Sequence, residues 1–434
     1  MKTACIIGAG ASGLATVKAF RDRDIDFDCF EMSDRIGGLW AYENPNGRSA
    51  AYRSLHINTS RQRMQFADFP MPRHYPDFPG HGLIYAYFRD YAAQFNLAAQ
   101  ISFNTTVERA EPVDGGWRIR LSTGDVREYR NLVVANGHHW SPRGPEPAFR
   151  GEFTGIQLHS HHYRDPVTPH DLRGKRVLVV GFGNSAMDIA CELGSPIHAQ
   201  RVFLSTRRGG WVVPKTILGR PMDRFPLRTW MPFWLRRFMF KLILRLAVGP
   251  YERYGLPTPD HDFGAAHPTV SSEIFLRLSS GDIGVKPNLA ELRGEHVCFV
   301  DGTVEAVDAI IWCTGYEIRF PFFDAKLLAA EDNCVDLFWN VFPPDKDNLA
   351  FIGLVQPIGA IMPIAELQAQ VVGDQVAGKY TLPPTKDRLA AIEQAKADMR
   401  ARYLPSKRHT IQVDFDDYME SFAAEGRAGH RRSA

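Results

Sequence analysis

The sequence has few cysteines, and none of them are close together. Its 434 residues include six, and no two form a C-x-x-C pair: Cys5, Cys29, Cys191, Cys298, Cys313 and Cys334. This spacing argues against a disulfide framework, a metal site or a dithiol redox centre. Reduced thiols in a cytoplasmic protein are the expectation, and no metal ligands are predicted.

Long apolar runs and a strong net charge are also absent. No run of 18 apolar residues occurs, so no membrane span is expected. An apolar strand and a glycine-rich loop follow Met1 almost at once, which does not fit a signal peptide. The net charge of +2 gives no argument for a nucleic-acid partner. With 44% hydrophobic residues, the chain can fill the cores of two or three domains.

A short apolar strand at residues 3–7 runs into a glycine-rich loop, and a helix is expected at 12–21. The loop, GAGASG, has the spacing G-x-G-x-x-G, with Gly8, Gly10 and Gly13. Such a turn directs free helix amides at a pyrophosphate. The next strand, 27–30, ends in Glu31, which is placed to bind ribose hydroxyls and to repel a 2′-phosphate. This loop therefore predicts FAD or NAD rather than NADP.

A second nucleotide-binding signature follows the apolar strand 177–180 and opens a helix at 185–193. Its spacing is G-x-G-x-x-A, with Gly181, Gly183 and Ala186. The next strand, 201–206, ends in Arg207 and Arg208, and guanidinium groups match phosphate oxygens. This site predicts NADPH rather than NADH, the alternative being two solvated surface arginines. Two dinucleotide sites in one chain indicate a flavin enzyme that is reduced by a nicotinamide.

The segment 225–248, FPLRTWMPFWLRRFMFKLILRLAV, is apolar and aromatic, with five basic residues and no acid. Packing within the core or between subunits is the expected role, so a homodimer stays open. A lid over a substrate channel and a membrane-surface helix are the alternatives.

Three further motifs resemble those of the flavin-containing monooxygenases. These enzymes are class B flavoprotein monooxygenases, and the resemblance is to the bacterial type. Between the two loops, the family pattern F-x-G-x-x-x-H-x-x-x-[YF] stands as Phe153, Gly155, His159 and Tyr163. The pattern Y-R-x-L-x-x-N stands as Tyr52, Arg53, Leu55 and Asn58, and the second linker motif stands at residues 313–316.

The resemblance implies an α/β fold with two doubly wound Rossmann-like dinucleotide-binding domains, the NADPH domain being inserted into the FAD domain. The implied ranges are 1–148 for the first part of the FAD-binding domain and 149–285 for the NADPH-binding domain. Residues 286–434 would form the second part of the FAD-binding domain and a C-terminal tail.

The resemblance also implies the residues of each site. For FAD they are Gly8, Gly10, Ser12, Gly13, Glu31, Gly38, Leu39, Trp40, Val107 and Gln356. For NADPH they are Gly181, Gly183, Asn184, Ser185, Ala186 and Arg207. Asn58 is the one catalytic residue implied: it would lie near the reactive edge of the isoalloxazine and hydrogen-bond to NADP⁺. Asparagine in a loop is otherwise more often a turn former.

The implied reaction is oxygenation of a soft nucleophile, an amine nitrogen or a sulfide sulfur of a small organic substrate, by a C4a-(hydro)peroxyflavin made with NADPH and O₂. A Baeyer–Villiger oxygenase acting on ketones is the alternative within the family, with Arg53, Arg61 or Arg63 as its arginine. A disulfide reductase would need a paired dithiol. A non-catalytic flavin-binding or membrane-associated protein is a further alternative. It would not account for the second nucleotide site, at the loop whose next strand ends in Arg207 and Arg208.

Overall fold

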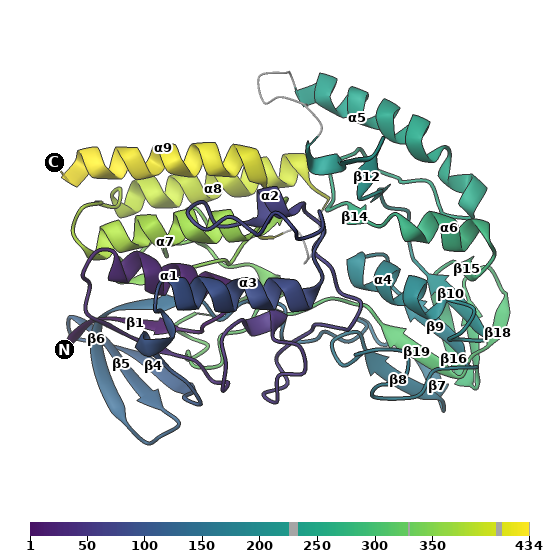
Figure 1. Cartoon of the computed structure of the whole chain (residues 1–434), viewed down its shortest axis with the longest axis horizontal. Helices are drawn as coiled ribbons and strands as arrows, with labels where there is room; N and C mark the ends of the chain where they lie inside the picture. Colours follow the sequence, from purple (N-terminus) through teal and green to yellow (C-terminus); the bar gives the residue numbers. More distant parts are fainter. Residues whose placement is uncertain (225–232, 329, 405–409, 434) are drawn as a thin grey trace. The chain divides into compact units, whose positions relative to one another are not determined.

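The computed structural model describes residues 1–224, 233–328, 330–404 and 410–433 (Figure 1). The chain divides into two compact units and passes between them four times. The first unit consists of Met1–Ser49, Thr59–Ser141 and Glu317–Ala434, and the second of Ala50–Asn58 and Pro142–Tyr316. Each unit has its own sheet and core, and the fold is α/β with mixed sheets.

The first unit contains a seven-stranded sheet in the order β3-β2-β1-β6-β5-β4, with β20 also paired to β6. Its strands are β1 Lys2–Ile7, β2 Phe27–Phe30, β3 Ile101–Ser102, β4 Val107–Val113, β5 Gly116–Leu121, β6 Val126–Val134 and β20 Leu349–Phe351. The neighbours from β3 to β6, and β20, run parallel, whereas β4 and β5 form antiparallel pairs. The apolar run of β1 is buried because the strand lies inside the sheet.

Helices of the first unit pack beside this sheet, and α1 contacts α7, which contacts α9. The helices are α1 Ala11–Arg21, α2 Arg61–Met64, α3 His81–Gln94, α7 Met362–Val376, α8 Thr385–Arg402 and α9 Phe415–Ser433. The short elements are η1 Gly38–Trp40, η2 Ala98–Gln100, η5 Glu331–Asn333, β21 Gln356–Ile358 and β22 Gln412–Asp414. The connection β1–α1–β2 joins two parallel strands, which is the arrangement that the first glycine-rich loop requires.

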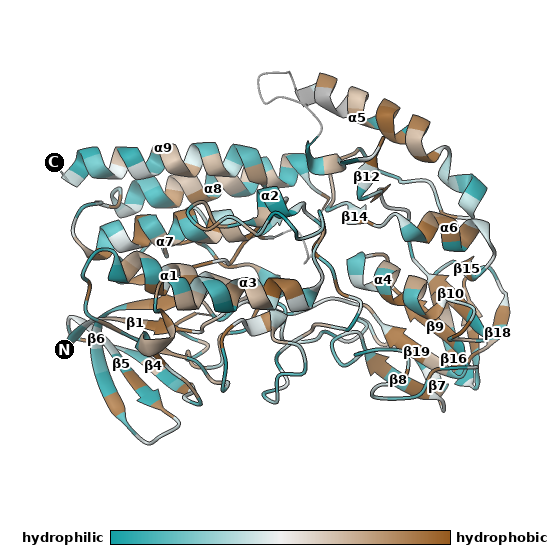
Figure 2. Cartoon of the chain, viewed as in Figure 1, coloured by the Kyte–Doolittle hydropathy of each residue, from teal (hydrophilic) through white to brown (hydrophobic). Residues whose placement is uncertain are grey.

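The second unit is built on a five-stranded parallel sheet in the order β15-β10-β9-β19-β8. These strands are β8 Ile156–His159, β9 Arg176–Val180, β10 Arg201–Ser205, β15 Ile283–Lys286 and β19 Ala309–Trp312. A four-stranded sheet contains β7 Arg150–Phe153, β16 Leu289–Gly294, β17 His296–Phe299 and β18 Val304–Ala306. The strands around β9 and β19 are strongly apolar (Figure 2), as expected for a sheet covered on both faces.

The remaining elements of the second unit are short, apart from two helices. They are β11 Val212–Val213, β12 Thr216–Ile217, β13 Arg220–Pro221, β14 Thr269–Val270, η3 Met222–Arg224, η4 Tyr251–Tyr254, α4 Asn184–Leu193, α5 Phe233–Val248 and α6 Glu273–Ser279. Helix α4 joins the parallel strands β9 and β10 and packs on both.

The second unit ends later than the boundary at residue 285 predicted from the sequence. Its last strand, β19, pairs with β9 in parallel, with Ile311 beside Val179, so the unit continues to Tyr316. The short segment 50–58 also belongs to this unit, although it precedes the rest of the unit in the sequence. Both differences come from contacts between residues far apart in the chain, which a local pattern does not reveal.

The described part of the basic aromatic segment is α5, since residues 225–232 lie outside the described residues. Phe240 and Leu244 are buried in the core of the second unit. Four large apolar side chains of this helix are exposed to between 48% and 79%: Trp234, Phe238, Leu242 and Leu246. Core packing therefore accounts for only part of the helix. Among the described residues, no helix is long and apolar enough to cross a membrane.

Candidate functional sites

The first glycine-rich loop lies between β1 and α1 and brings its three glycines together. Gly8 has a φ of +101°, and a Cβ on it would lie 2.7 Å from Ala135 O. A Cβ on Gly13 would lie 1.9 Å from Gly8 O, so α1 approaches the loop at a distance that only glycine allows. Gly10 is the N-cap of α1, and no described side chain caps the helix. The first turn is thus arranged to direct amides at a pyrophosphate.

Glu31 follows β2 and is tied to this loop. Its Oε2 accepts a hydrogen bond from Ala9 N at 2.7 Å, and its Oε1 accepts one from Ser33 N at 2.9 Å. Burial raises the pKa of Glu31, whereas the hydrogen bonds from the Ser33 and Ala9 amides lower it. The carboxylate therefore fastens the phosphate loop, a role beyond the ribose contact predicted from the sequence.

The residues after the Gly37–Gly38 pair form η1 and lie against the same loop. Gly38 has a φ of +53°, and a Cβ on it would lie 3.1 Å from Gly10 Cα. Leu39 O accepts a hydrogen bond from Ser49 Oγ at 2.6 Å. The side chains of Leu39 and Trp40 are half-buried. The structure thus brings this turn next to the phosphate loop.

The other predicted flavin contacts come from three elements of the first unit. Ser12, in the first turn of α1, lies against Gly353, where an added Cβ would come within 2.1 Å of the Ser12 Oγ. Val107 begins β4 and is 6% exposed, within the core beside the sheet. Gln356 begins β21, and its backbone N–H donates to Ile411 O at 2.7 Å. Ser12 is the one of the three that belongs to the phosphate loop.

The parallel strands β1, β6 and β20 end at one edge of the sheet, where ligands of such sheets bind. Two residues at this edge were not predicted as site residues. Gly353 follows β20 with a φ of +75°. His138 follows β6, and burial lowers its pKa to about 4, so its imidazole is neutral at pH 7. In the sequence, an apolar strand runs into the pattern A-x-G at 135–137, and this pattern could have indicated His138 as a site residue. No local pattern indicates Gly353.

The second loop lies between β9 and α4 and repeats the geometry of the first. Gly181 has a φ of +136°, and a Cβ on it would lie 2.6 Å from Cys313 O. Gly183 is the N-cap of α4, and no described side chain caps this helix. Ala186 is fully buried in the core under the helix, where its small side chain permits close helix–strand packing.

Asn184 and Ser185 begin α4. Asn184 Oδ1 accepts a hydrogen bond from Val270 N at 2.8 Å, and the neighbouring Thr269 Oγ1 donates to Phe182 O at 2.6 Å. The Asn184 side chain therefore fastens β14 to the loop. Ser185 is half-buried in the first turn.

The two arginines after β10 differ in their contacts. Arg208 donates from Nε and Nη2 to Asp260 Oδ2 at 3.0 and 2.9 Å. Arg207 is exposed and forms no ion pair with any residue that the structure describes. Of the two guanidinium groups, that of Arg208 is engaged within the unit, and the predicted phosphate contact of Arg207 stays a prediction.

Asn58 ends the segment 50–58, and its amide oxygen is not satisfied by any residue that the structure describes. The Oδ1 atom is buried and accepts no hydrogen bond from the described residues. Leaving a buried acceptor unsatisfied costs about 1–3 kcal/mol, so this atom is open to a hydrogen bond from water or from a bound group. An ordinary turn asparagine would instead bond to its own backbone.

A polar cavity of about 410 Å³ lies beside this segment in the second unit, lined in part by Ser54, Asp188 and Lys215. Burial raises the pKa of Asp188 to about 6, while the hydrogen bond from Tyr52 and the charge of Lys215 lower it. Walls with charges of both signs suit water better than an apolar substrate.

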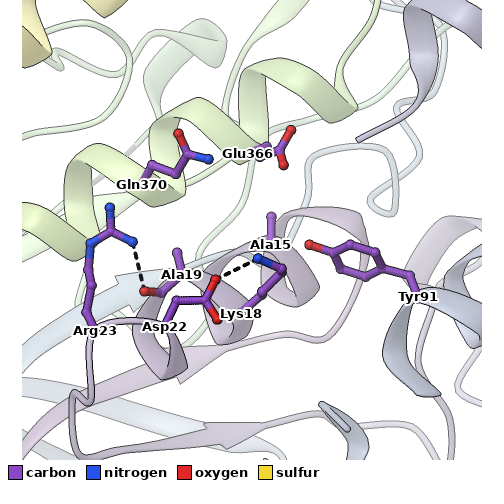
Figure 3. A pocket seen from close by; sticks show the side chains of 8 residues that line it. All are labelled: Ala15, Lys18, Ala19, Asp22, Arg23, Tyr91, Glu366 and Gln370. Carbon is purple, nitrogen blue, oxygen red and sulfur yellow. Dashed lines mark hydrogen bonds and ion pairs between the residues drawn. The ribbon is translucent and has the colours of Figure 1, made fainter. Parts of the chain in front are cut away.

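Figure 3 shows a smaller cavity, of about 100 Å³, lined by residues of α1 and α7 in the first unit. Lys18 Nζ lies 2.6 Å from Asp22 Oδ2 and 2.7 Å from Asp68 Oδ2. Arg23 Nη1 donates to Ala19 O at 3.0 Å. Ligand pockets have volumes of roughly 300 Å³ or more, and this cavity is smaller. It is therefore a polar gap between packed helices rather than a ligand pocket.

The residues present fit two dinucleotides and no metal. Both loops carry glycine positions that a Cβ would fill, both open an uncapped helix, and Asn58 offers a buried acceptor. No group of three or more metal-ligating side chains occurs in the part of the chain that the structure describes.

Comparisons with known proteins agree with this geometry. The sequence model described as flavin-binding monooxygenase-like matches residues 1–428. Flavin-containing monooxygenase 5 of Rattus norvegicus is 38% identical over 97% of this chain and 82% of its own length. The N-oxide-forming dimethylaniline monooxygenase 2 of the same species is 36% identical over 98% of this chain and 82% of its own.

Solved structures show the same fold. The S-allyl-L-cysteine S-oxygenase of Allium sativum has a TM-score of 0.73 at 24% identity, covering 100% of this chain and 92% of its own. A cyclohexanone monooxygenase has a TM-score of 0.73 at 16% identity, covering 99% and 98%.

Proposed function

The chain belongs to the flavin-binding monooxygenase-like family, and we propose how its two units divide the work of an FAD- and NADPH-dependent monooxygenase. Each unit is a doubly wound, Rossmann-like domain. The first binds FAD at the loop that Glu31 fastens, and the second binds NADPH at the loop that opens α4. The contrast between Glu31 and Arg207 at equivalent strand ends carries this assignment, because a carboxylate repels the 2′-phosphate that a guanidinium attracts.

Bound at these residues, FAD would supply the redox and oxygen chemistry, with NADPH as the hydride donor and O₂ as the source of the oxygen atom that enters the substrate. The chain itself binds and orients the cofactors and excludes water. The uncapped first turns of α1 and α4 hold the two pyrophosphates. Asn58 accepts a hydrogen bond from the bound NADP⁺ through its buried Oδ1 and so keeps the nucleotide in place after the hydride has left.

Oxygenation of an amine nitrogen or a sulfide sulfur is the favoured chemistry. The ketone-oxidising alternative calls for a free arginine, and two of the three candidates form ion pairs within their own units, whereas Arg61 keeps a buried Nε with no hydrogen-bond partner among the described residues. Arg53 forms an ion pair with Asp165 at 3.1 Å, and Arg63 forms one with Asp416 at 2.5 Å. Arg61 Nη1 lies 3.5 Å from the carbonyl oxygen of Pro72.

Purified protein tests this function directly. We expect a yellow protein that consumes NADPH and O₂ together and converts members of a panel of amines, sulfides, indoles and ketones. Oxygenated amines or sulfides as the main products would support the proposal. Lactones or esters from the ketones alone would favour the Baeyer–Villiger reaction, and a colourless protein would contradict both.

The remaining proposals concern location and partners. A cytoplasmic location is supported by the six cysteines, which are all free. The small substrate and O₂ are the only ligands expected besides the cofactors, with no nucleic acid. We propose that a second copy of the chain covers the exposed stripe of α5, so that the protein is a homodimer.

We expect the protein to stay in the supernatant with anionic liposomes at physiological salt. Attraction to an anionic surface needs several free basic residues, at about 1 kcal/mol each, and Lys241 is paired with Asp262 at 2.7 Å. Sedimentation velocity should show a dimer, which Phe238→Glu converts to a monomer that still folds, because Phe238 is 62% exposed within the single chain. Salt-sensitive sedimentation with the liposomes would instead assign the stripe to a membrane surface.

A further inference from the structure

The segment 50–58, which carries Asn58, is fastened near its start by polar contacts. Tyr52 is 3% exposed, and its hydroxyl donates to Asp188 Oδ2 at 2.6 Å. The amide of Arg53 donates to Arg164 O at 2.8 Å, and its guanidinium pairs with Asp165. These partners all belong to the second unit.

The same segment is also held next to Asn58. Lys215 Nζ lies 3.5 Å from Ile57 O, one residue before Asn58. Asp188 belongs to α4, one turn after the helix begins at the second phosphate loop. One short helix therefore carries the phosphate loop at its N-terminus and the acceptor for Tyr52 on its next turn.

Packing alone leaves room for this segment to move. The cavity of about 410 Å³ borders Ser54, His56, Asp188 and Lys215, so one side of the segment faces open space. A segment beside such a space keeps one position only if specific bonds fix it. Tyr52 is buried and its bond to Asp188 is partly buried, whereas the Arg53 side chain is 69% exposed, so the tyrosine bond is the stronger restraint.

We propose that Tyr52 and Asp188 are positioning residues, which hold the segment 50–58 on α4 so that Asn58 Oδ1 stays in register with the nucleotide bound at the same helix. The inference rests on the proposed role of Asn58. Neither Tyr52 nor Asp188 touches the reacting atoms. Their effect reaches the reaction through the position of one amide oxygen.

Hydrogen exchange of the protein without added nucleotide tests the link independently of activity. Tyr52→Phe removes only the hydroxyl, and we expect amide exchange in residues 50–58 to rise about tenfold, as for one lost hydrogen bond. Tyr129→Phe is the control for the loss of a buried tyrosine hydroxyl: Tyr129 is fully buried, and its hydroxyl donates to Asp28 Oδ2 at 2.6 Å within the first unit, outside the segment. It should leave exchange in 50–58 unchanged.

The second readout is the ratio of product formed to NADPH consumed. We expect Tyr52→Phe to lower this ratio several-fold, and Asp188→Asn, which keeps an oxygen acceptor, to restore most of it relative to Asp188→Ala. The Asp188 pair tests the same bond from the helix, should Tyr52→Phe not fold. Equal exchange in Tyr52→Phe and Tyr129→Phe, or faster exchange with an unchanged ratio, would overturn the inference.

The two proposals can fail separately. If Asn58→Leu lowers the ratio but Tyr52→Phe changes neither readout, the positioning role is wrong and the role of Asn58 stands. If Asn58→Leu leaves the ratio unchanged, the role of Asn58 fails, and the positioning role fails with it even where exchange shows that the Tyr52–Asp188 bond holds the segment.

Discussion

Asn58→Leu should uncouple NADPH consumption from substrate oxygenation. The leucine has a similar volume, but it has no oxygen to accept the hydrogen bond that we propose the buried Oδ1 of Asn58 accepts from NADP⁺. Loss of one such bond, about 1–3 kcal/mol, loosens the nucleotide by roughly tenfold or more. With NADP⁺ less firmly held, water reaches the flavin site and oxygen leaves as H₂O₂.

The measurement is the ratio of product to NADPH consumed, with peroxide assayed in parallel. Flavin content serves as the internal control, because the phosphate loop and Glu31 belong to the first unit and Asn58 to the second. The variant should therefore remain yellow. A normal ratio in a fully flavinated variant would remove Asn58 from the mechanism.

Arg207→Ala should weaken NADPH binding by roughly 10- to 150-fold and leave NADH nearly unchanged. A charge-assisted hydrogen bond to the 2′-phosphate contributes about 1.5–3 kcal/mol to binding. Arg207 forms no ion pair with the described residues, so the substitution removes no other ion pair of this side chain there. The structure provides a matched control in the next residue. Arg208 is engaged by Asp260, so Arg208→Ala should change NADPH affinity far less.

The test is to measure the dissociation constants of NADPH and NADH for the unchanged protein, Arg207→Ala and Arg208→Ala. Equal losses for NADPH and NADH in Arg207→Ala would show that Arg207 does not read the 2′-phosphate. A larger loss in Arg208→Ala would transfer that role to its neighbour.

The local elements of both nucleotide sites could be predicted because their patterns are local. The strand at 177–180 and the helix at 185–193 are confirmed as β9 and α4, and the strand at 27–30 is confirmed as β2. The strands β1 and β9 are apolar runs followed by glycines whose conformations few other residues adopt, and β2 is a mostly apolar run that ends at an acid.

Other features could not be read from the sequence, since they depend on contacts between distant residues. The Tyr52–Asp188 bond joins positions 136 residues apart, so neither residue stands out in its own surroundings. The strand β19 is apolar like its neighbours, and only its pairing with β9 places it in the second unit. The sequence marks Asn58 only through a family motif, whereas the structure shows that its oxygen is unsatisfied.

The order in which the two sheets are completed has a consequence for synthesis on the ribosome. The second unit lies almost entirely within 142–316, so its parallel sheet can form as soon as β19 has emerged. The first unit must wait, because β6 pairs with β20 and α1 packs on α7, both encoded near the end of the chain. We infer that the inserted unit folds first during translation, while the edge of β6 remains open to chaperones or to misassembly until the last third of the chain arrives.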